Sequence, residues 1–138
     1  ISLAQQLKTA DLRWQPRTHD FFAIPDRDMD AAVFVLSDMM AYLAKLRGQP
    51  IVAFAGATEW ALDHIWVDDV VWLPTEAQLR QEIADRLPPQ QGFSLHRIAD
   101  GYQCQLNLNQ QPHTFDAPTA SDAYGLALLF LLKPIPFK

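Results

Sequence analysis

The sequence predicts an α+β fold, a compact single domain that ends in an α-β-β-β-α unit with an antiparallel sheet packed by helices. Three observations indicate this class. The chain has capping-box motifs at two helix starts, an Asp-Gly pair between two strand-like segments, and a strand with strict apolar–polar alternation. Its 138 residues, 49% of them apolar, suffice for one core. We therefore expect one domain over residues 1–138, with possible halves at 1–74 and 75–138.

The first half is expected to follow the order α-β-β-α-β-α. Ser2 and Gln5 form a capping box that starts a short helix. Segments rich in β-branched and aromatic residues predict strands at residues 21–24, 32–36 and 51–55, and a short extended piece at residues 70–73.

Two further helices are expected in this half. Ser37 and Asp38 can each cap a helix that runs to Leu46, because its apolar residues share one face and a glycine follows as a stop. Another helix is expected over residues 58–67, which carry a glutamate in the first turn.

The helices of the second half carry stronger signals. Residues 75–78 form a second capping box, and the helix that follows has apolar residues at every fourth position, Leu79, Ile83 and Leu87. A last helix is expected to start after the N-cap Thr119 and to end before Pro134, which cannot continue it.

A β-hairpin is expected between these two helices. Asp100-Gly101 separates the strand-like segments 93–98 and 102–108, which favours a type I′ turn at this pair. A third strand is expected over residues 114–117, after Pro112.

Motifs for metal binding and catalysis are incomplete in this chain. Residues 26–30 begin like a calcium-binding loop, but Ala31 stands where a glycine is needed and Ser37 where a bidentate glutamate is needed. The four histidines are separate in the sequence, and no nucleophile or phosphate-loop motif occurs. The sequence therefore predicts no catalytic residue, no metal and no cofactor.

Cys104 is the single cysteine of the chain. It lies on the apolar face of the alternating strand, so we expect a core thiol whose pKa is raised by desolvation. With one cysteine no intrachain disulfide can form, and residues 1–10 lack the pattern of a signal peptide. Both features favour the cytoplasm.

Tryptophan is the most notable side-chain excess. Three tryptophans recur six residues apart, and a histidine and an aspartate lie between them. One helix and one strand cannot bury all three rings on one face, and exposed tryptophan is enriched at binding sites. The candidate pocket or interface residues are Trp60, His64, Trp66, Asp68 and Trp72.

The last helix is apolar on nearly all sides, which leaves two alternatives. Such a helix lies either in the centre of the fold or against a partner chain. In the second case, the candidate dimer contacts are Tyr124, Leu128, Phe130 and Leu131. A glycine at position 125 allows a close approach on one side.

The charge of the chain restricts its partners. Eleven basic and sixteen acidic residues give a net charge of −5, which disfavours contact with a nucleic-acid backbone. The longest apolar stretch is too short to span a membrane. We expect a non-enzymatic protein–protein interaction or adaptor domain, possibly homodimeric. The alternative is a small-molecule-binding protein or hydrolase with a pocket near Trp60 and His64.

Several segments resemble those of a family of small bacterial proteins of unknown function. The segments that carry the resemblance are residues 20–25, 33–38, 59–62, 71–75, 100–102 and 120–127. The second half alone is also similar to short phage and prophage proteins. Some family members carry an automatic pilus-assembly label, but the phosphate-binding loop of pilus assembly ATPases has no counterpart in this sequence. The resemblance implies no catalytic residues.

Overall fold

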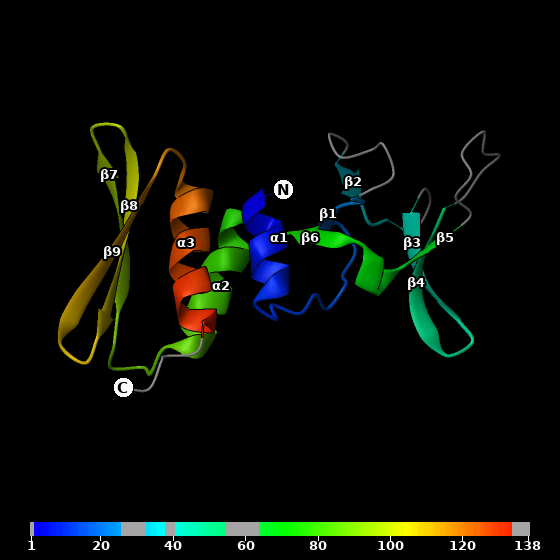
Figure 1. The fold of residues 1–138 in the computed structure, drawn as a ribbon, viewed down its shortest axis with the longest axis horizontal. Coiled ribbons are helices and arrows are strands. Elements are labelled where there is room, and N and C mark those ends of the chain that lie inside the picture. Colours follow the sequence, from blue (N-terminus) through cyan, green and yellow to red (C-terminus); the bar gives the residue numbers. More distant parts are fainter. Residues whose placement is uncertain (1, 26–32, 38–40, 55–63, 134–138) are drawn as a thin grey trace. The chain divides into compact units, whose positions relative to one another are not determined.

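The computed structural model describes residues 2–25, 33–37, 41–54 and 64–133, and within these ranges the chain has a mixed α+β fold (Figure 1). It divides into two units. The first unit is Arg13–Pro74, and the second consists of Ser2–Leu12 together with Thr75–Lys138. Each unit is described by itself below.

The first unit contains two antiparallel sheets of three strands each among its described residues. Their strand orders are β2-β1-β6 and β3-β4-β5. The strands are β1 (Phe21–Ala23), β2 (Phe34–Val35), β3 (Ala41–Leu46), β4 (Gln49–Phe54), β5 (His64–Trp66) and β6 (Val71–Leu73), and a 3-10 turn covers Val67–Asp69. Strands predicted near residues 21–24, 32–36 and 51–55 are thus confirmed as β1, β2 and β4, although with different bounds.

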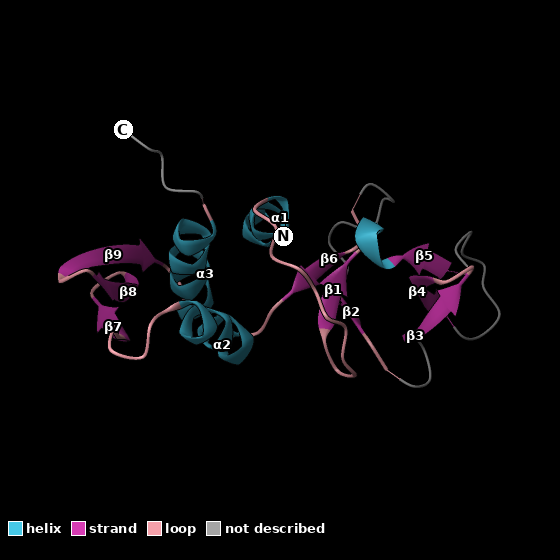
Figure 2. Cartoon of the chain, turned by 90° about the horizontal axis from the view of Figure 1, so that it is seen from below, coloured by secondary structure: helices cyan, strands magenta, loops and turns pink. Residues whose placement is uncertain are grey.

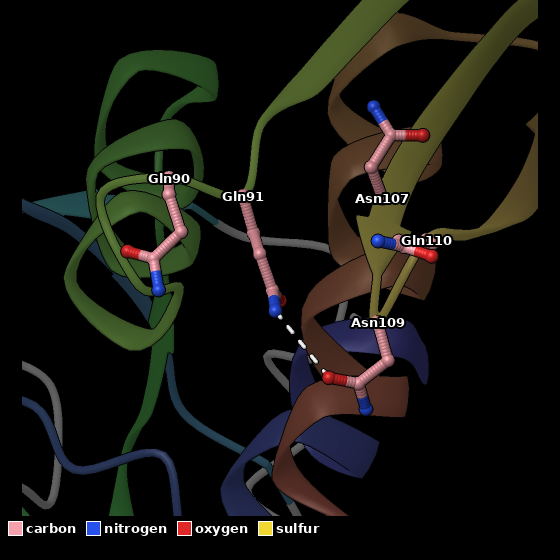
Figure 3. Close-up of a pocket in the computed structure, with 5 residues that line it drawn as sticks. All are labelled: Gln90, Gln91, Asn107, Asn109 and Gln110. Atoms are coloured by element: carbon pink, nitrogen blue, oxygen red, sulfur yellow. Dashed lines mark hydrogen bonds between the residues drawn. The ribbon is translucent and has the colours of Figure 1, made fainter.

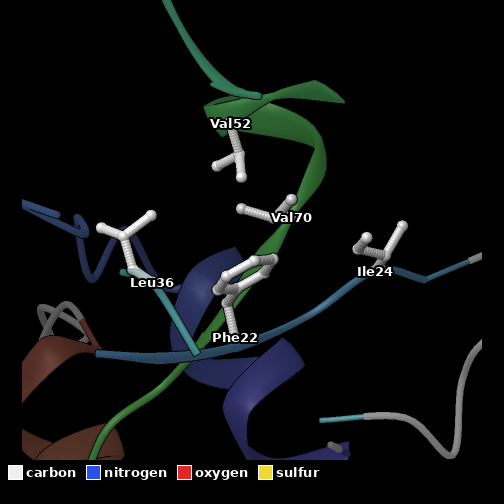
Figure 4. Close-up of a cluster of buried hydrophobic side chains, with 5 residues drawn as sticks. All are labelled: Phe22, Ile24, Leu36, Val52 and Val70. Atoms are coloured by element: carbon white, nitrogen blue, oxygen red, sulfur yellow. The ribbon is translucent and has the colours of Figure 1, made fainter. Parts of the chain in front are cut away.

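The core of the first unit joins its two sheets. Phe22 has no exposed surface, and its ring lies 5.5 Å from that of Phe34 and 5.7 Å from that of Trp14. The buried side chains of this cluster are Phe22, Ile24, Leu36, Val52 and Val70 (Figure 4). Because Val52 comes from β4 while Phe22 comes from β1, burial of these side chains holds the two sheets together.

The helix predicted to end at Leu46 is wrong where the structure describes it. Ala41–Leu46 is strand β3, which pairs residue by residue with β4. Arg47 and Gly48, at φ 52° and φ 80°, form a two-residue turn with both residues in the left-handed region, which closes a hairpin. Pairing with the apolar strand β4 therefore outweighs the helical spacing of the apolar residues. Residues 38–40 lie outside the described part.

The helix predicted over residues 58–67 is also wrong at its end. His64–Trp66 is strand β5, which pairs with β4, and the 3-10 turn follows directly. A β-branched residue between two aromatic side chains suits a pleated strand. Residues 58–63 lie outside the described part of the chain.

The second unit confirms the predicted α-β-β-β-α arrangement. Its helices are α1 (Ser2–Thr9), α2 (Glu76–Arg86) and α3 (Ala120–Leu132), and its strands are β7 (Phe93–Ile98), β8 (Gly101–Leu108) and β9 (Gln111–Ala117). The strand order is β7-β8-β9. Helix α3 is central: it contacts β8 and β9 on one side and α1 and α2 on the other (Figures 1 and 2).

The predicted N-caps of α2 and α3 are present. The Thr75 hydroxyl accepts from the Gln78 backbone at 3.2 Å, and the Gln78 side chain accepts from the Thr75 backbone at 2.9 Å. At the start of α3, the Thr119 hydroxyl accepts from the Asp122 backbone at 3.1 Å. These bonds satisfy amides that a helix start leaves without an internal partner.

The hairpins differ from the prediction in turn geometry. Ile98 pairs with Gly101, so the loop is Ala99-Asp100, and the type I′ turn predicted at Asp100-Gly101 is wrong, because Asp100 has no positive φ. The β8–β9 loop has this geometry instead, with φ 50° at Asn109 and 67° at Gln110.

Strand β9 begins at Gln111, earlier than predicted, and it contains Pro112. A proline is tolerated in an edge strand when its missing N–H would point to the open side of the sheet.

Candidate interaction surface

The backbone of β9 leaves hydrogen-bonding groups on its open side. The Asn107 amide of β8 donates to the Gly92 carbonyl at 3.0 Å, on the β7 side. Backbone groups alternate sides along a strand, so the even-numbered residues of β8 pair with β9. Because Leu106 and Cys104 lie opposite His113 and Phe115, these two residues of β9 bond to β8. The even-numbered residues of β9 therefore point their backbone groups to the open edge.

Thr114 and Asp116 each offer an amide and a carbonyl group at this edge, whereas Pro112 offers only a carbonyl. Among the described strands, β9 has β8 as its neighbour on one side and none on the other. An edge of this kind can accept a further strand.

An exposed aromatic cluster lies beside the same strand. The Phe130 side chain of α3 is 41% exposed. Its ring centre lies 5.0 Å from that of His113 and 5.4 Å from that of Phe115, both of which are partly buried. We call these three side chains, together with the backbone of Thr114 and Asp116, the β9 edge surface.

Strand β7 forms the opposite edge of the sheet. By the same alternation, Leu95 and Arg97 point their backbone groups to the open side of β7. A charged side chain is exposed on both edge strands, Arg97 on β7 and Asp116 on β9, and such a side chain discourages unspecific pairing with another chain. The β9 edge surface differs in that the exposed ring of Phe130 lies beside its open backbone groups.

The far face of the sheet is polar. Gln103 donates to the Asp116 carboxylate at 2.9 Å, and the Ser94 hydroxyl lies 3.0 Å from His96 Nε2. The Asp116 side chain is therefore fixed on the face away from α3. Its carboxylate and the His113 ring lie on opposite sides of the sheet, so they cannot act together as an acid–base pair.

The tryptophan-rich candidate residues are divided between two sheets. His64 and Trp66 are the first and last residues of β5. Asp68 is exposed in the 3-10 turn, and Trp72 lies on β6, opposite Phe22. The Trp72 indole N–H is buried and has no hydrogen-bond acceptor within the described ranges. Trp60 lies outside the described residues.

The candidate dimer contacts of α3 differ in exposure. Tyr124 is 5% exposed and Leu128 is fully buried, both inside the second unit. Leu131 is partly buried, and Phe130 is the residue of this set that reaches the surface. A partner that contacts α3 in this unit therefore meets Phe130 before Tyr124 or Leu128.

The predicted site residues do not include His113, Phe115 or the open backbone of Thr114. Alternation over residues 111–117 could have revealed them, because His113, Phe115 and Ala117 lie opposite the apolar residues of the neighbouring strand.

A shallow hollow in the second unit was also not predicted. It has a volume of about 540 Å³ and is lined by side-chain amides, from Gln90, Gln91, Asn107, Asn109 and Gln110 (Figure 3). Gln91 donates to Asn109 at 3.5 Å, a long hydrogen bond. Primary amides can donate to and accept from a neutral polar molecule, but they supply no acid, base or nucleophile.

No group of three or more His, Cys, Asp or Glu side chains in the described ranges could hold a metal ion. Within the same ranges, no helix is long and apolar enough to cross a membrane.

Cys104 is a core residue, as predicted. Its side chain has no exposed surface, and burial raises the pKa of the thiol from 9.0 to about 11. Burial also raises the pKa of Tyr124, and the neighbouring Cys104 charge acts in the same direction. The thiol therefore stays protonated and unreactive at neutral pH.

We expect the free energy of unfolding to fall as the pH rises from about 9 to about 11. The thiol ionises first in the unfolded chain, so its contribution is complete below the unfolded pKa and is lost through the folded pKa. The full loss is about 2 to 3 kcal/mol for a shift of roughly 2 pKa units. Urea unfolding at about pH 8 and about pH 10.5 measures the greater part of this loss. The Cys104→Ala variant should lose less unfolding free energy over this pH range than the wild type. An equal loss in the two proteins contradicts the assignment of the loss to the Cys104 thiol.

No protein-family model, no curated protein and no solved structure matches this chain.

Proposed function

We propose that this protein is a non-enzymatic interaction domain of the adaptor type, which binds an extended segment of a partner chain along the β9 edge surface. The observation that supports this function is the exposed ring of Phe130 beside the open backbone of β9. The single cysteine of the chain favours a reducing compartment, and we place the protein in the cytoplasm.

An added strand uses both parts of the surface. Its backbone pairs with Thr114 and Asp116, which supplies affinity without sequence preference. Its alternate side chains lie on the same face as His113 and Phe115, where the ring of Phe130 lies. The preferred partner segment is therefore extended and carries a bulky apolar side chain at that position.

Phe130 is expected to contribute most of the specificity. Aromatic side chains are frequent among the few residues that dominate binding energy at interfaces. The packing of Phe130 against His113 and Phe115 holds the ring in place before binding, which reduces the entropy lost when a partner binds.

Photo-cross-linking from position 130 tests this function. A photoreactive phenylalanine analogue replaces Phe130 in cells that express the protein, and the same analogue at Phe21, which is 37% exposed on β1, serves as the matched control. We expect a defined protein adduct from position 130, at a yield several times that from position 21. An adduct yield at position 130 no higher than at position 21 contradicts the function.

A further inference from the structure

We propose that the β9 edge surface pairs with the same surface of a second copy of this chain, so that two β9 strands run antiparallel and join two sheets. This inference rests on the proposed function and names its partner. Three properties of β9 support it: its hydrogen-bonding groups, its cross-strand side chains and the distribution of charge around it.

The hydrogen-bonding groups complement themselves. The midpoint of β9 (Gln111–Ala117) is Thr114, so an antiparallel copy overlaps the whole strand when Thr114 lies opposite Thr114 of the second copy. In that register the two Thr114 residues exchange amide and carbonyl groups, and the Asp116 amide donates to the Pro112 carbonyl of the second copy. Every open N–H group of β9 then has an acceptor. Because Pro112 has no N–H group, one hydrogen bond per chain is not formed.

The side chains also fit this register. Asp116, the acidic side chain of β9, lies opposite Pro112 of the second copy and not opposite another carboxylate. On the other face, His113 lies opposite Phe115 of the second copy. Aromatic cross-strand pairs are favourable, and like charges directly opposite each other are not. Each new pair adjoins a Phe130 ring, which it helps to cover.

Charges at the two ends of the surface are complementary under a two-fold axis. Helix α3 runs back along β9, so its first turn with Asp122 lies near the end of the strand and Lys133 lies near the beginning. In an antiparallel pair, the beginning of β9 in the second copy lies beside the end of β9 in the first copy. The acidic end of each copy thus meets the basic end of the other, which favours this orientation despite the net charge of −5 on each chain.

A proline at the open edge tests the pairing. Thr114→Pro removes the central amide from both strands of the pair, so we expect sedimentation equilibrium of the purified chain to give a dissociation constant raised about thirtyfold. Arg97→Pro is the matched control, because it removes an open amide from β7 on the other edge of the same sheet, and it should change the constant less than about twofold.

A disulfide provides a second measurement that needs no proline. Residues opposite each other in a hydrogen-bonded antiparallel pair have Cα atoms about 5.5 Å apart, within disulfide range. Thr114→Cys should therefore form a covalent dimer on mild oxidation, while Asp116→Cys should not, and the buried Cys104 does not compete.

The outcomes separate this inference from the proposed function. A wild-type chain that is monomeric at all concentrations, or a dimer equally affected by Thr114→Pro and Arg97→Pro, overturns self-pairing. If the Phe130 analogue then cross-links to a different protein, the interaction function stands with another partner. If position 130 gives no more adduct than position 21, both fail.

Discussion

Replacing Gly101 with alanine is expected to lower the free energy of unfolding by roughly 3 kcal/mol or more. Gly101 has φ +152°, and a Cβ at this position would lie 2.9 Å from the Pro118 Cα and closer still to the Ala117 carbonyl oxygen. Those backbone atoms cannot shift easily, because Ala117 pairs with Tyr102 and the chain turns there into the cap of α3. The energetic cost of the clash and the cost of the strained backbone conformation therefore add.

Gly92→Ala is the control for this substitution. A Cβ on Gly92 meets no atom within 4 Å, and the residue is not in the left-handed region. Its effect should stay within about 0.5 kcal/mol, as for most surface changes. Urea unfolding followed by circular dichroism measures both variants. Equal free energies of unfolding for the two variants would show that the start of β8 at Gly101 and the end of β9 at Ala117 are not as tightly packed as described.

Leu128→Ala is expected to cost about 3 kcal/mol of the free energy of unfolding, whereas Phe130→Ala should cost less than about 1 kcal/mol. Leu128 is fully buried where α3 packs between the sheet and the other helices. Removing its side chain leaves a cavity inside the unit. Phe130 is 41% exposed, so its truncation mainly removes surface contacts with His113 and Phe115.

The same pair of variants should separate folding from binding. Phe130→Ala is expected to reduce partner binding in a protein that remains folded, since Phe130 lies at the surface. If instead Phe130→Ala destabilises the protein as strongly as Leu128→Ala does, then Phe130 belongs to the core and not to the binding surface.

Local signals were sufficient for most of the second unit. The Thr75 capping box and the Thr119 cap act within a few residues, so the sequence alone predicts where α2 and α3 begin. The β7–β8 hairpin was predicted for the same reason. Its turn was not, because the register that closes on Ile98 and Gly101 depends on pairing along the whole strand.

The first unit depends on contacts between distant residues, and there the prediction failed. Ala41–Leu46 has a helical spacing of apolar residues, but its pairing with β4 decides the structure. The same limit applies to the candidate site. The sequence named Phe130 together with Tyr124 and Leu128, because it could not show which sides of α3 the sheet and the other helices cover.

The early start of β9 was missed for a related reason. The sequence predicts this strand only after Pro112, although proline fits an edge strand whose N–H side is open. The side on which an amide points follows from the pairing register, which the sequence does not display. The predicted strand therefore does not include His113, which makes one of the two ring contacts of β9 with Phe130.

Amide hydrogen exchange of β9, with and without its partner, tests the central claim most directly. In the unpaired chain, the Thr114 and Asp116 amides point to the open edge and should exchange fast, while the His113 and Phe115 amides bond to β8 and should exchange slowly. When the partner binds, or at high concentration of the chain itself, Thr114 and Asp116 should become protected and the Arg97 amide on β7 should not. Binding that leaves the exchange of Thr114 and Asp116 unchanged would contradict an interaction through the β9 edge surface.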